Sequence, residues 1–261
     1  MKSVILSVIL ILVFTSSLYA LDKNGLVLYL SFDEGDGEVA MDASDYGNDG
    51  ELIGGAEWVE GKFGTAVHLP EAGDFVEVPT SESLDIIEEI TMEIWANVDS
   101  IGADPYCSFI TKCTADLLGA YMLHVDGSAG QVAIDPLVFI DSSYGQWPSA
   151  SGAAPFGEWH YFAASYDGSE YKTYVDGELV STFQRNPGGE IDQSEANVAI
   201  GRDNRYAIPG TRFMDCILDE ARIWNRVLTD EEILEAMEGI LLSVDPEDLL
   251  TATWGGVKVG F

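Results

Sequence analysis

Short β-type segments recur along almost the whole chain, and they restrict its fold more than any other feature. Apolar or alternating runs, such as residues 26–32 and 90–98, are separated by stretches rich in Gly, Asp and Asn. This pattern is typical of strands joined by turns. The clearest unit is a meander over residues 159–183, whose last turn, Asp176-Gly177, favours a tight hairpin because both residues tolerate positive φ. The sequence therefore predicts an all-β sandwich of two antiparallel sheets.

One helix is predicted near the C-terminal end. Thr229 and Glu232 have the spacing of a capping box, in which each side chain bonds a backbone N–H of the first helical turn. Ile233 and Met237 lie four residues apart and supply an apolar face. Gly239 is a suitable stop because glycine readily adopts the left-handed conformation that ends many helices.

The two ends of the chain differ in composition from its middle. Lys2, an apolar run over 4–14 and small residues before Ala20 are typical of an export signal, so residues 1–20 are predicted to be a signal peptide. An uncleaved N-terminal anchor is the alternative. Residues 21–240 form the predicted domain, and residues 241–261 form a tail without an assigned role. We expect a secreted protein, extracellular or at the cell surface, whose mature chain does not insert into a membrane.

The charge of the chain limits its partners. Twelve Lys and Arg residues oppose 45 Asp and Glu residues, which gives a formal net charge of −33. Nucleic acid is excluded as an expected partner because its phosphates would be repelled. Anionic membrane surfaces are disfavoured for the same reason. The acidic side chains are scattered along the chain and could supply the oxygen ligands that Ca²⁺ requires.

Several motifs occur in an order that resembles a known family. They are the strand at 25–35, the turn Gly47-Asn48-Asp49-Gly50, the segment Gly157-Glu158-Trp159-His160, the hairpin at 174–178 and the closing strand at 218–226. Their order resembles the concanavalin A-like jelly rolls, with laminin-G-like domains, of bacterial surface proteins, over nearly all of residues 25–240. The resemblance implies a concanavalin A-like (laminin-G-like) jelly-roll β-sandwich of two antiparallel sheets with one short C-terminal helix.

The same fold serves lectins, adhesion modules, hydrolases and lyases, so it leaves the function open. The leading expectation is a non-catalytic recognition or adhesion module that binds carbohydrate or another cell-surface ligand. The alternative is a glycoside hydrolase or polysaccharide lyase, because Glu190, Asp192 and Glu195 match the E-x-D-x-x-E motif of laminarinase-like hydrolases. Pro187-Gly188-Gly189 directly precede this match, which favours a polar connecting loop instead. A structural part of a surface assembly is a third possibility.

Two loops carry the residue types that a sugar site needs. Aromatic rings stack on sugars, and Asn, Asp and Arg side chains hydrogen-bond hydroxyl groups, within a mainly apolar site. The long loop at 141–157 and the loop after Gly201 both contain such residues. The predicted ligand-binding residues are Tyr144, Trp147, Arg202, Asn204, Arg205 and Tyr206.

A calcium ion is predicted between the first and last strands of the domain. In the family that this chain resembles, these strands are neighbours, so Asp33 and Asp219 are expected at matching positions. Asn48 lies in a Gly-bounded turn soon after Asp33 and could add an oxygen. Two carboxylates with amide or backbone oxygens suit Ca²⁺. The alternative is that both Asp side chains cap loop N–H groups.

The cysteines and histidines give little information about function. Cys107 and Cys113 lie six residues apart and could form a disulfide in an exported protein, and two free, buried thiols are the alternative. Cys216 is expected to be a buried thiol. His68, His124 and His160 show no catalytic or metal-ligand spacing, so each is expected to be packed or hydrogen-bonded.

Overall fold

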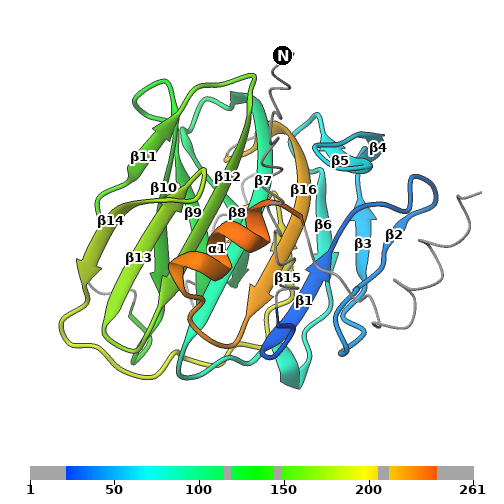
Figure 1. The fold of residues 1–261 in the computed structure, drawn as a ribbon. Coiled ribbons are helices and arrows are strands. Elements are labelled where there is room, and N and C mark those ends of the chain that lie inside the picture. The colour runs from blue at the N-terminus through cyan, green and yellow to red at the C-terminus, as the bar shows by residue number, and fades with distance from the viewer. Residues whose placement is uncertain (1–21, 115–118, 144–147, 205–211, 240–261) are drawn as a thin grey trace, which may run out of the picture.

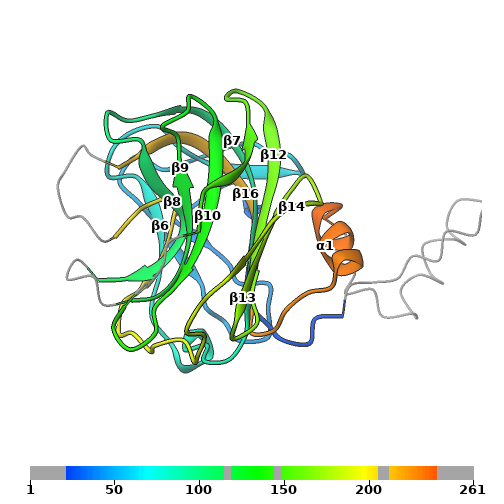
Figure 2. The same cartoon turned by 90° about the vertical axis from the view of Figure 1, so that its left-hand side faces the viewer.

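The computed structural model describes residues 22–114, 119–143, 148–204 and 212–239, and it contains two antiparallel sheets packed face to face. Figure 2 shows the two layers edge-on, with one helix outside them. The predicted all-β sandwich of two antiparallel sheets is therefore confirmed. The predicted signal peptide, residues 1–20, and the predicted tail, residues 241–261, lie outside the described residues.

Sheet A has eight strands in the order β14-β13-β12-β7-β16-β5-β4, with β1 also paired to β16. Their bounds are β1 Leu26–Leu30, β4 Glu57–Glu60, β5 Thr65–Leu69, β7 Ile90–Ile101, β12 Trp159–Tyr166, β13 Glu170–Val175, β14 Glu178–Gln184 and β16 Met214–Trp224. Sheet B has the order β11-β10-β9-β8-β15-β6-β3-β2. Its strands are β2 Val39–Ala40, β3 Gly50–Ile53, β6 Phe75–Val78, β8 Tyr106–Cys113, β9 Gly119–Asp126, β10 Val132–Val138, β11 Ser151–Ala154 and β15 Val198–Ile200.

The first and last strands of the domain are neighbours, as predicted. β1 and β16 pair antiparallel, with Leu26 opposite Trp224 and Leu30 opposite Ala221 (Figure 1). Further along, β16 pairs with β5 through residues 216–218. The partner of β16 on this side therefore changes from β5 to β1 at Asp219 and Glu220, where its register also shifts against β7.

The main core lies between the two sheets. Alternate residues of each strand point inward, and the rings of Phe109 on β8 and Phe162 on β12 lie 5.0 Å apart across the interface. These residues join one continuous cluster with side chains from both sheets, including Val67, Val76 and Leu123. Burial of apolar area of this extent is the main favourable contribution to folding.

A second apolar cluster lies on the outer face of sheet A, under helix α1 (Asp230–Met237). Figure 1 shows α1 crossing this face in front of the strands. Ile233 is fully buried there, and the Trp95 indole N–H donates to the carbonyl of Met237 at 2.9 Å. The predicted capping box between Thr229 and Glu232 is present. Gly239 has φ +71°, which confirms it as the helix stop.

The predicted tight hairpin is also confirmed. Asp176 and Gly177, between β13 and β14, have φ of 50° and 76°, so both turn residues adopt the left-handed conformation. A side chain at Gly177 would also meet Leu234 of α1, because its Cβ would lie 2.5 Å from Leu234 Cδ2.

The cysteines form no disulfide. Of the two alternatives predicted for Cys107 and Cys113, the structure therefore shows two buried thiols. Cys107 and Cys113 occupy the two ends of β8, and six residues of extended strand separate them by about 20 Å. A disulfide requires Cα atoms within about 7 Å. Both thiols and that of Cys216 are buried.

Candidate functional site

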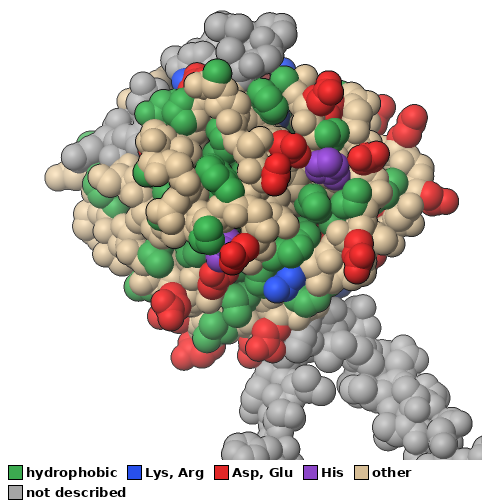
Figure 3. Space-filling model, turned by 90° about the horizontal axis from the view of Figure 1, so that it is seen from above, with side chains coloured by type: hydrophobic (Ala, Val, Ile, Leu, Met, Phe, Trp, Pro, Cys, Tyr) green, Lys and Arg blue, Asp and Glu red, His purple; other side chains and the backbone are tan. Residues whose placement is uncertain are grey.

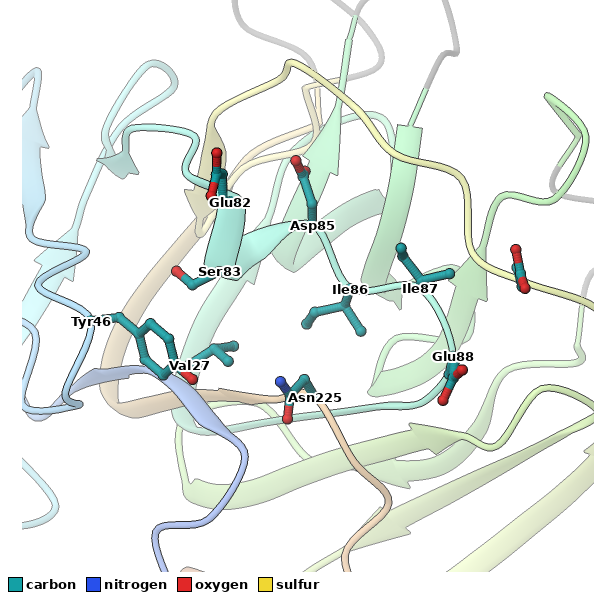
Figure 4. Close-up of a pocket in the computed structure, with 10 residues that line it drawn as sticks. Val27, Tyr46, Glu82, Ser83, Asp85, Ile86, Ile87, Glu88 and Asn225 are labelled. Atoms are coloured by element: carbon teal, nitrogen blue, oxygen red, sulfur yellow. The ribbon is translucent and has the colours of Figure 1, made fainter.

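A pocket of about 480 Å³ opens at one end of the sandwich, beside the start of β7. Figure 4 shows Tyr46 and Ile86 pointing into the same space, with Ser83 and Asn225 on either side of it. The Tyr46 side chain is 53% exposed, whereas Ile86 is 4% exposed and forms part of the floor. These four residues come from four separate segments: the loop before β3, the 3-10 helix η1 (Glu82–Leu84), the link to β7 and the residue after β16.

The loop that carries Tyr46 is held by Asp42. One carboxylate oxygen of Asp42 accepts from the backbone N–H groups of Tyr29 and Ser44, both at 2.9 Å. The other oxygen accepts from the Asn48 N–H at 2.8 Å and from the Ser44 hydroxyl at 2.6 Å. Such Asx-type bonds fix a loop without regular secondary structure. Tyr46 is therefore presented by an ordered loop.

Asn48 fastens this loop to the rest of the pocket. It is buried, and its amide donates to the Val27 carbonyl at 2.7 Å and to Ser83 Oγ at 2.9 Å. Its oxygen accepts from Ser81 Oγ at 2.7 Å. The side chain that we predicted as a calcium ligand is thus engaged with β1 and η1.

The opposite wall of the pocket is anchored by a buried lysine. Lys112 Nζ donates to Thr80 Oγ1 at 2.7 Å and to the carbonyl of Ala196 at 3.1 Å, and it forms an ion pair with Asp85 at 3.2 Å. It also donates to the carbonyl of Ser194 at 2.5 Å. These bonds join the segment after η1 to the connection between β14 and β15.

The pocket continues into a second hollow of about 460 Å³. The two share Ile87 and Glu190, and the second is also lined by Ile140, Asp141 and Asp192. We call the two hollows together the edge groove. Glu82, Asp85, Glu88, Glu190, Asp141 and Asp192 contribute carboxylates to its lining, and no Lys or Arg of the described segments lines it.

The E-x-D-x-x-E match lies in the connection between β14 and β15, not in a strand. Glu190 and Glu195 are exposed. The Asp192 carboxylate accepts from the backbone N–H groups of Asp141 at 3.0 Å and Ser142 at 2.7 Å, both of which have positive φ. Asp192 therefore stabilises a strained turn, and the interpretation of this motif as a polar connecting loop is confirmed.

Two of the six predicted ligand-binding residues, Arg202 and Asn204, fall within the described residues. Tyr144, Trp147, Arg205 and Tyr206 lie outside the described residues. The Arg202 guanidinium lies 4.6 Å from the centre of the Phe75 ring. Asn204 is partly exposed. Both follow the end of β15 that is away from the edge groove, since residues 190–193 precede this strand.

Asp33 and Asp219 are brought together, but Asn48 is not brought to them. Both carboxylates lie against the turn between β4 and β5: Asp33 Oδ1 accepts from Thr65 N–H at 3.2 Å, and Asp219 Oδ2 accepts from Phe63 N–H at 2.9 Å. Asp219 is fully buried, and its Oδ1 has no hydrogen-bond partner. Burial, with the nearby charges of Glu220 and Asp33, raises the pKa of Asp219 to about 7.

This arrangement fits a cation in part. An unpartnered, buried carboxylate oxygen beside a second carboxylate is a position where a positive ion would relieve repulsion. The described residues contain no cluster of three or more His, Cys, Asp or Glu side chains suited to a metal. Backbone carbonyls or water would therefore have to supply the other oxygens of a six- to eight-coordinate Ca²⁺.

Each histidine is hydrogen-bonded to a carboxylate, as expected of structural histidines. His124 Nδ1 lies 2.7 Å from Asp135 Oδ1, and His160 Nδ1 lies 2.8 Å from Asp176 Oδ2. His68 contacts two carboxylates, those of Glu57 and Asp215.

Four residues that surround the first pocket of the edge groove were not predicted from the sequence. Tyr46, Ser83, Ile86 and Asn225 come from segments far apart in the chain, and no local pattern marks them as neighbours. The one available indication was an aromatic residue within the Asp- and Gly-rich loop at 42–50. Nothing in the sequence marked this tyrosine as exposed.

A family model described as the concanavalin A-like lectin/glucanases superfamily matches residues 70–234. None of the curated proteins compared with this chain matches it. No helix in the described part of the chain is long and apolar enough to span a membrane.

Solved structures with the same fold include binding domains. The binding domain of Paraclostridial Mosquitocidal Protein 1 has a TM-score of 0.63 and 13% identity, with 82% of this chain and 52% of that chain covered. Domain 4 of an extracellular arabinanase from Geobacillus stearothermophilus, in complex with arabinotriose, has a TM-score of 0.61 and 18% identity, with 81% and 98% covered. The binding domain of botulinum neurotoxin DC, in complex with rat synaptotagmin II, has a TM-score of 0.63 and 12% identity, with 83% and 52% covered.

These similarities differ in extent. The chain spans about half the length of the two toxin binding domains but nearly the whole of the arabinanase domain. At 12–18% identity, the similarity shows a shared fold.

Proposed function

The chain belongs to the concanavalin A-like lectin/glucanases superfamily, and from this membership we propose that it is a non-catalytic recognition module that binds carbohydrate in the edge groove. We further propose that it acts outside the cell, as a secreted or cell-surface protein. The export-type N-terminal sequence supports this location.

The composition of the first pocket carries the proposal. A sugar ring offers an apolar face for stacking and hydroxyl groups for hydrogen bonds, so its site combines apolar surface with a few fixed polar groups. Tyr46 supplies an exposed ring, Ile86 an apolar floor, and Ser83 and Asn225 a hydroxyl and an amide (Figure 4). Asn48 and Asp42 hold this arrangement in place, which reduces the entropy cost of binding.

Two further observations support recognition rather than cleavage. Two of the structural neighbours are described as binding domains, and a third, a domain of an extracellular arabinanase, is in complex with arabinotriose. Asp192, the middle residue of the hydrolase-like motif, uses both carboxylate oxygens to hold a turn. A retaining hydrolase needs two carboxyl groups about 5–5.5 Å apart across the scissile bond.

The proposal is tested by screening the mature protein against a glycan array that includes arabino-oligosaccharides, followed by calorimetry with the tightest binder. Tyr46→Ala should weaken binding at least tenfold, about 1.4 kcal/mol. Tyr46→Phe keeps the ring and should retain most of the affinity. Asp36→Ala alters an exposed acidic residue outside the groove and serves as the control. If Tyr46→Ala binds every glycan with the same affinity and stoichiometry as the wild-type protein, the groove is not the site.

We also propose that Asp33 and Asp219 hold a structural cation, with calcium as the first candidate. The unpartnered Oδ1 of Asp219 and its raised pKa support this proposal. Asn48 has no part in it, because its side chain is bonded to Val27, Ser81 and Ser83.

A further inference from the structure

Helix α1 covers only part of the outer face of sheet A. Trp95 and Tyr161 pair across β7 and β12 under the helix and belong to its apolar cluster. Two residues further along β7, Asn97 pairs with Trp159 on one side and with Ile217 on the other. Ile217 in turn pairs with His68. Directly opposite residues of an antiparallel sheet lie on the same face, so this row continues the outer face beyond α1.

A pocket of about 330 Å³ lies on this part of sheet A. His68, Asn97, Asp99, Asp215 and Ile217 line it, together with Gly157. A Cβ at Gly157 would meet no atom within 4 Å, so the space beside this residue is open. Figure 3 looks down on the end of the molecule at which β7 finishes and shows histidine and acidic side chains beside hydrophobic ones.

Some polar side chains of the pocket are already hydrogen-bonded to each other, and others are free to bind a ligand. The His68 ring is held on both sides, with Nδ1 3.3 Å from Glu57 Oε1 and Nε2 2.9 Å from Asp215 Oδ1. By contrast, the side chains of Asn97 and Asp99 form no hydrogen bond with any described residue. Their amide and carboxylate are therefore available to a ligand.

We propose that this pocket is a second carbohydrate-binding site, in which Asn97 and Asp99 bind the hydroxyl groups of a sugar that packs on Ile217. Carboxylate and amide oxygens accept hydrogen bonds from vicinal hydroxyls, and the amide N–H groups donate to them. Trp159 lies beside Asn97 in the same row and is partly exposed, so it extends the apolar surface. The residue content combines apolar surface with a small set of polar groups, as sugar sites do.

The second site is independent of the edge groove. The groove lies beside the first residue of β7, Ile90, whereas Asn97 and Asp99 lie seven and nine residues further along the same strand. At about 3.3 Å per residue, more than 20 Å separates the two sites. A glycan surface presenting many copies of one sugar would then be bound through two contacts, which raises the overall affinity by avidity.

The test measures stoichiometry and affinity by calorimetry with the oligosaccharide that binds tightest on the array. The wild-type protein should bind two equivalents. Asn97→Ala/Asp99→Ala and Tyr46→Ala should each bind one, and the triple variant should bind none. Asp36→Ala is the control for a changed surface charge, and thermal unfolding shows that each variant is folded.

The two proposals fail in different ways. If only the edge groove is wrong, Tyr46→Ala leaves binding unchanged while Asn97→Ala/Asp99→Ala abolishes it. If the second site is wrong, Asn97→Ala/Asp99→Ala leaves both stoichiometry and affinity as in the wild-type protein for every glycan that binds. That result would overturn the present inference and leave the groove standing, and binding of no glycan at all would overturn both.

Discussion

His68 lies between two carboxylates, which favour the protonated form of its ring in the folded protein. Burial alone would lower the pKa of His68, but the hydrogen bonds with Asp215 and Glu57 outweigh it and raise the pKa above its ordinary 6.5. A neutral imidazole has one N–H and can donate to only one of the two acceptors. The protonated ring therefore stabilises the contact between the edge strand β4 and β16.

The stability contributed by His68 should depend on pH. Because the pKa is raised in the folded state, the contribution is fully present below about pH 6.5 and is lost as the pH rises through the folded-state value. We expect the difference in Tm between wild type and His68→Gln to shrink from about pH 5.5 to about pH 8.5. Differential scanning calorimetry across this range measures it. A difference that stays constant or widens would contradict this explanation.

Asp219 also makes stability fall as the pH rises, but through the burial of its charged form. Its pKa is raised to about 7, chiefly by burial, from an ordinary value of 3.8. The folded state therefore binds more protons than the unfolded state between these values, and stability falls as the pH rises from about 4 to about 7. Asp219→Asn should remove this part of the decline in chelator-treated protein. Denaturant titrations at several pH values would show it, and an unchanged slope would rule it out.

A cation at Asp33 and Asp219 would remove the same penalty. An ion that binds only the folded state stabilises it by about 2.7 kcal/mol at a hundredfold excess over Kd. The Tm of the wild-type protein should therefore rise with millimolar calcium and fall with EDTA, and Asp219→Asn should abolish most of that shift. Asn48→Ala is not a matched control because it disturbs the Tyr46 loop, so Asp36→Ala is used. Equal Tm values in calcium and EDTA would exclude this site.

Among the secondary-structure elements, α1 depends most clearly on its own sequence. Thr229 Oγ1 accepts from the Glu232 N–H at 3.2 Å, and Glu232 Oε2 accepts from the Thr229 N–H at 2.8 Å. Thr229→Ala should lower the free energy of unfolding by about 1 kcal/mol, whereas Thr229→Ser should keep most of it. Urea titrations measure both. Equal losses in the two variants would mean that the hydroxyl is not responsible.

The helix also depends on the sheet beneath it. The indole N–H of Trp95 donates to the carbonyl of Met237, and the guanidinium of Arg222 donates to the carbonyl of Ala236. Side chains of sheet A therefore supply hydrogen bonds to the last carbonyl groups of α1. Arg222 is fully buried and forms ion pairs with Glu93 and Glu220. Leaving either carboxylate without this partner would be strongly destabilising, because a buried charge would lose its compensation.

For the whole molecule, the two packed sheets should protect the cysteines. Burial raises the pKa of Cys107 to about 12 and that of Cys216 well above its ordinary value. The thiol of Cys113 is likewise buried. Because the thiolate is the reactive form, a thiol reagent should label none of the three in the native protein and all three in denaturant. Fast labelling of any of them under native conditions would indicate local opening of the sandwich.

Local patterns alone were sufficient to predict the strands, the hairpin and the capped helix. Asp176-Gly177 and Thr229 with Glu232 act within a few residues of their own position, and the β-type pattern of 90–98 indicates a strand. The prediction that Glu190–Glu195 forms a loop also rested on adjacent residues. These features follow from backbone preferences and from neighbouring side chains, which the sequence records directly.

Only the tertiary structure decided which side chains meet. Tyr46, Ser83 and Asn225 surround one pocket because β1 pairs with β16 and because Asn48 bonds both β1 and η1. Asp33 and Asp219 converge because β16 changes its partner at that point, while Asn48 is drawn away by Val27 and Ser83. Contacts between distant segments depend on pairing register and on competition for hydrogen bonds across the whole chain. Local sequence patterns contain neither the pairing register nor the outcome of this competition. They were therefore sufficient to predict the sandwich, whereas the packing of the two sheets determined where its sites lie.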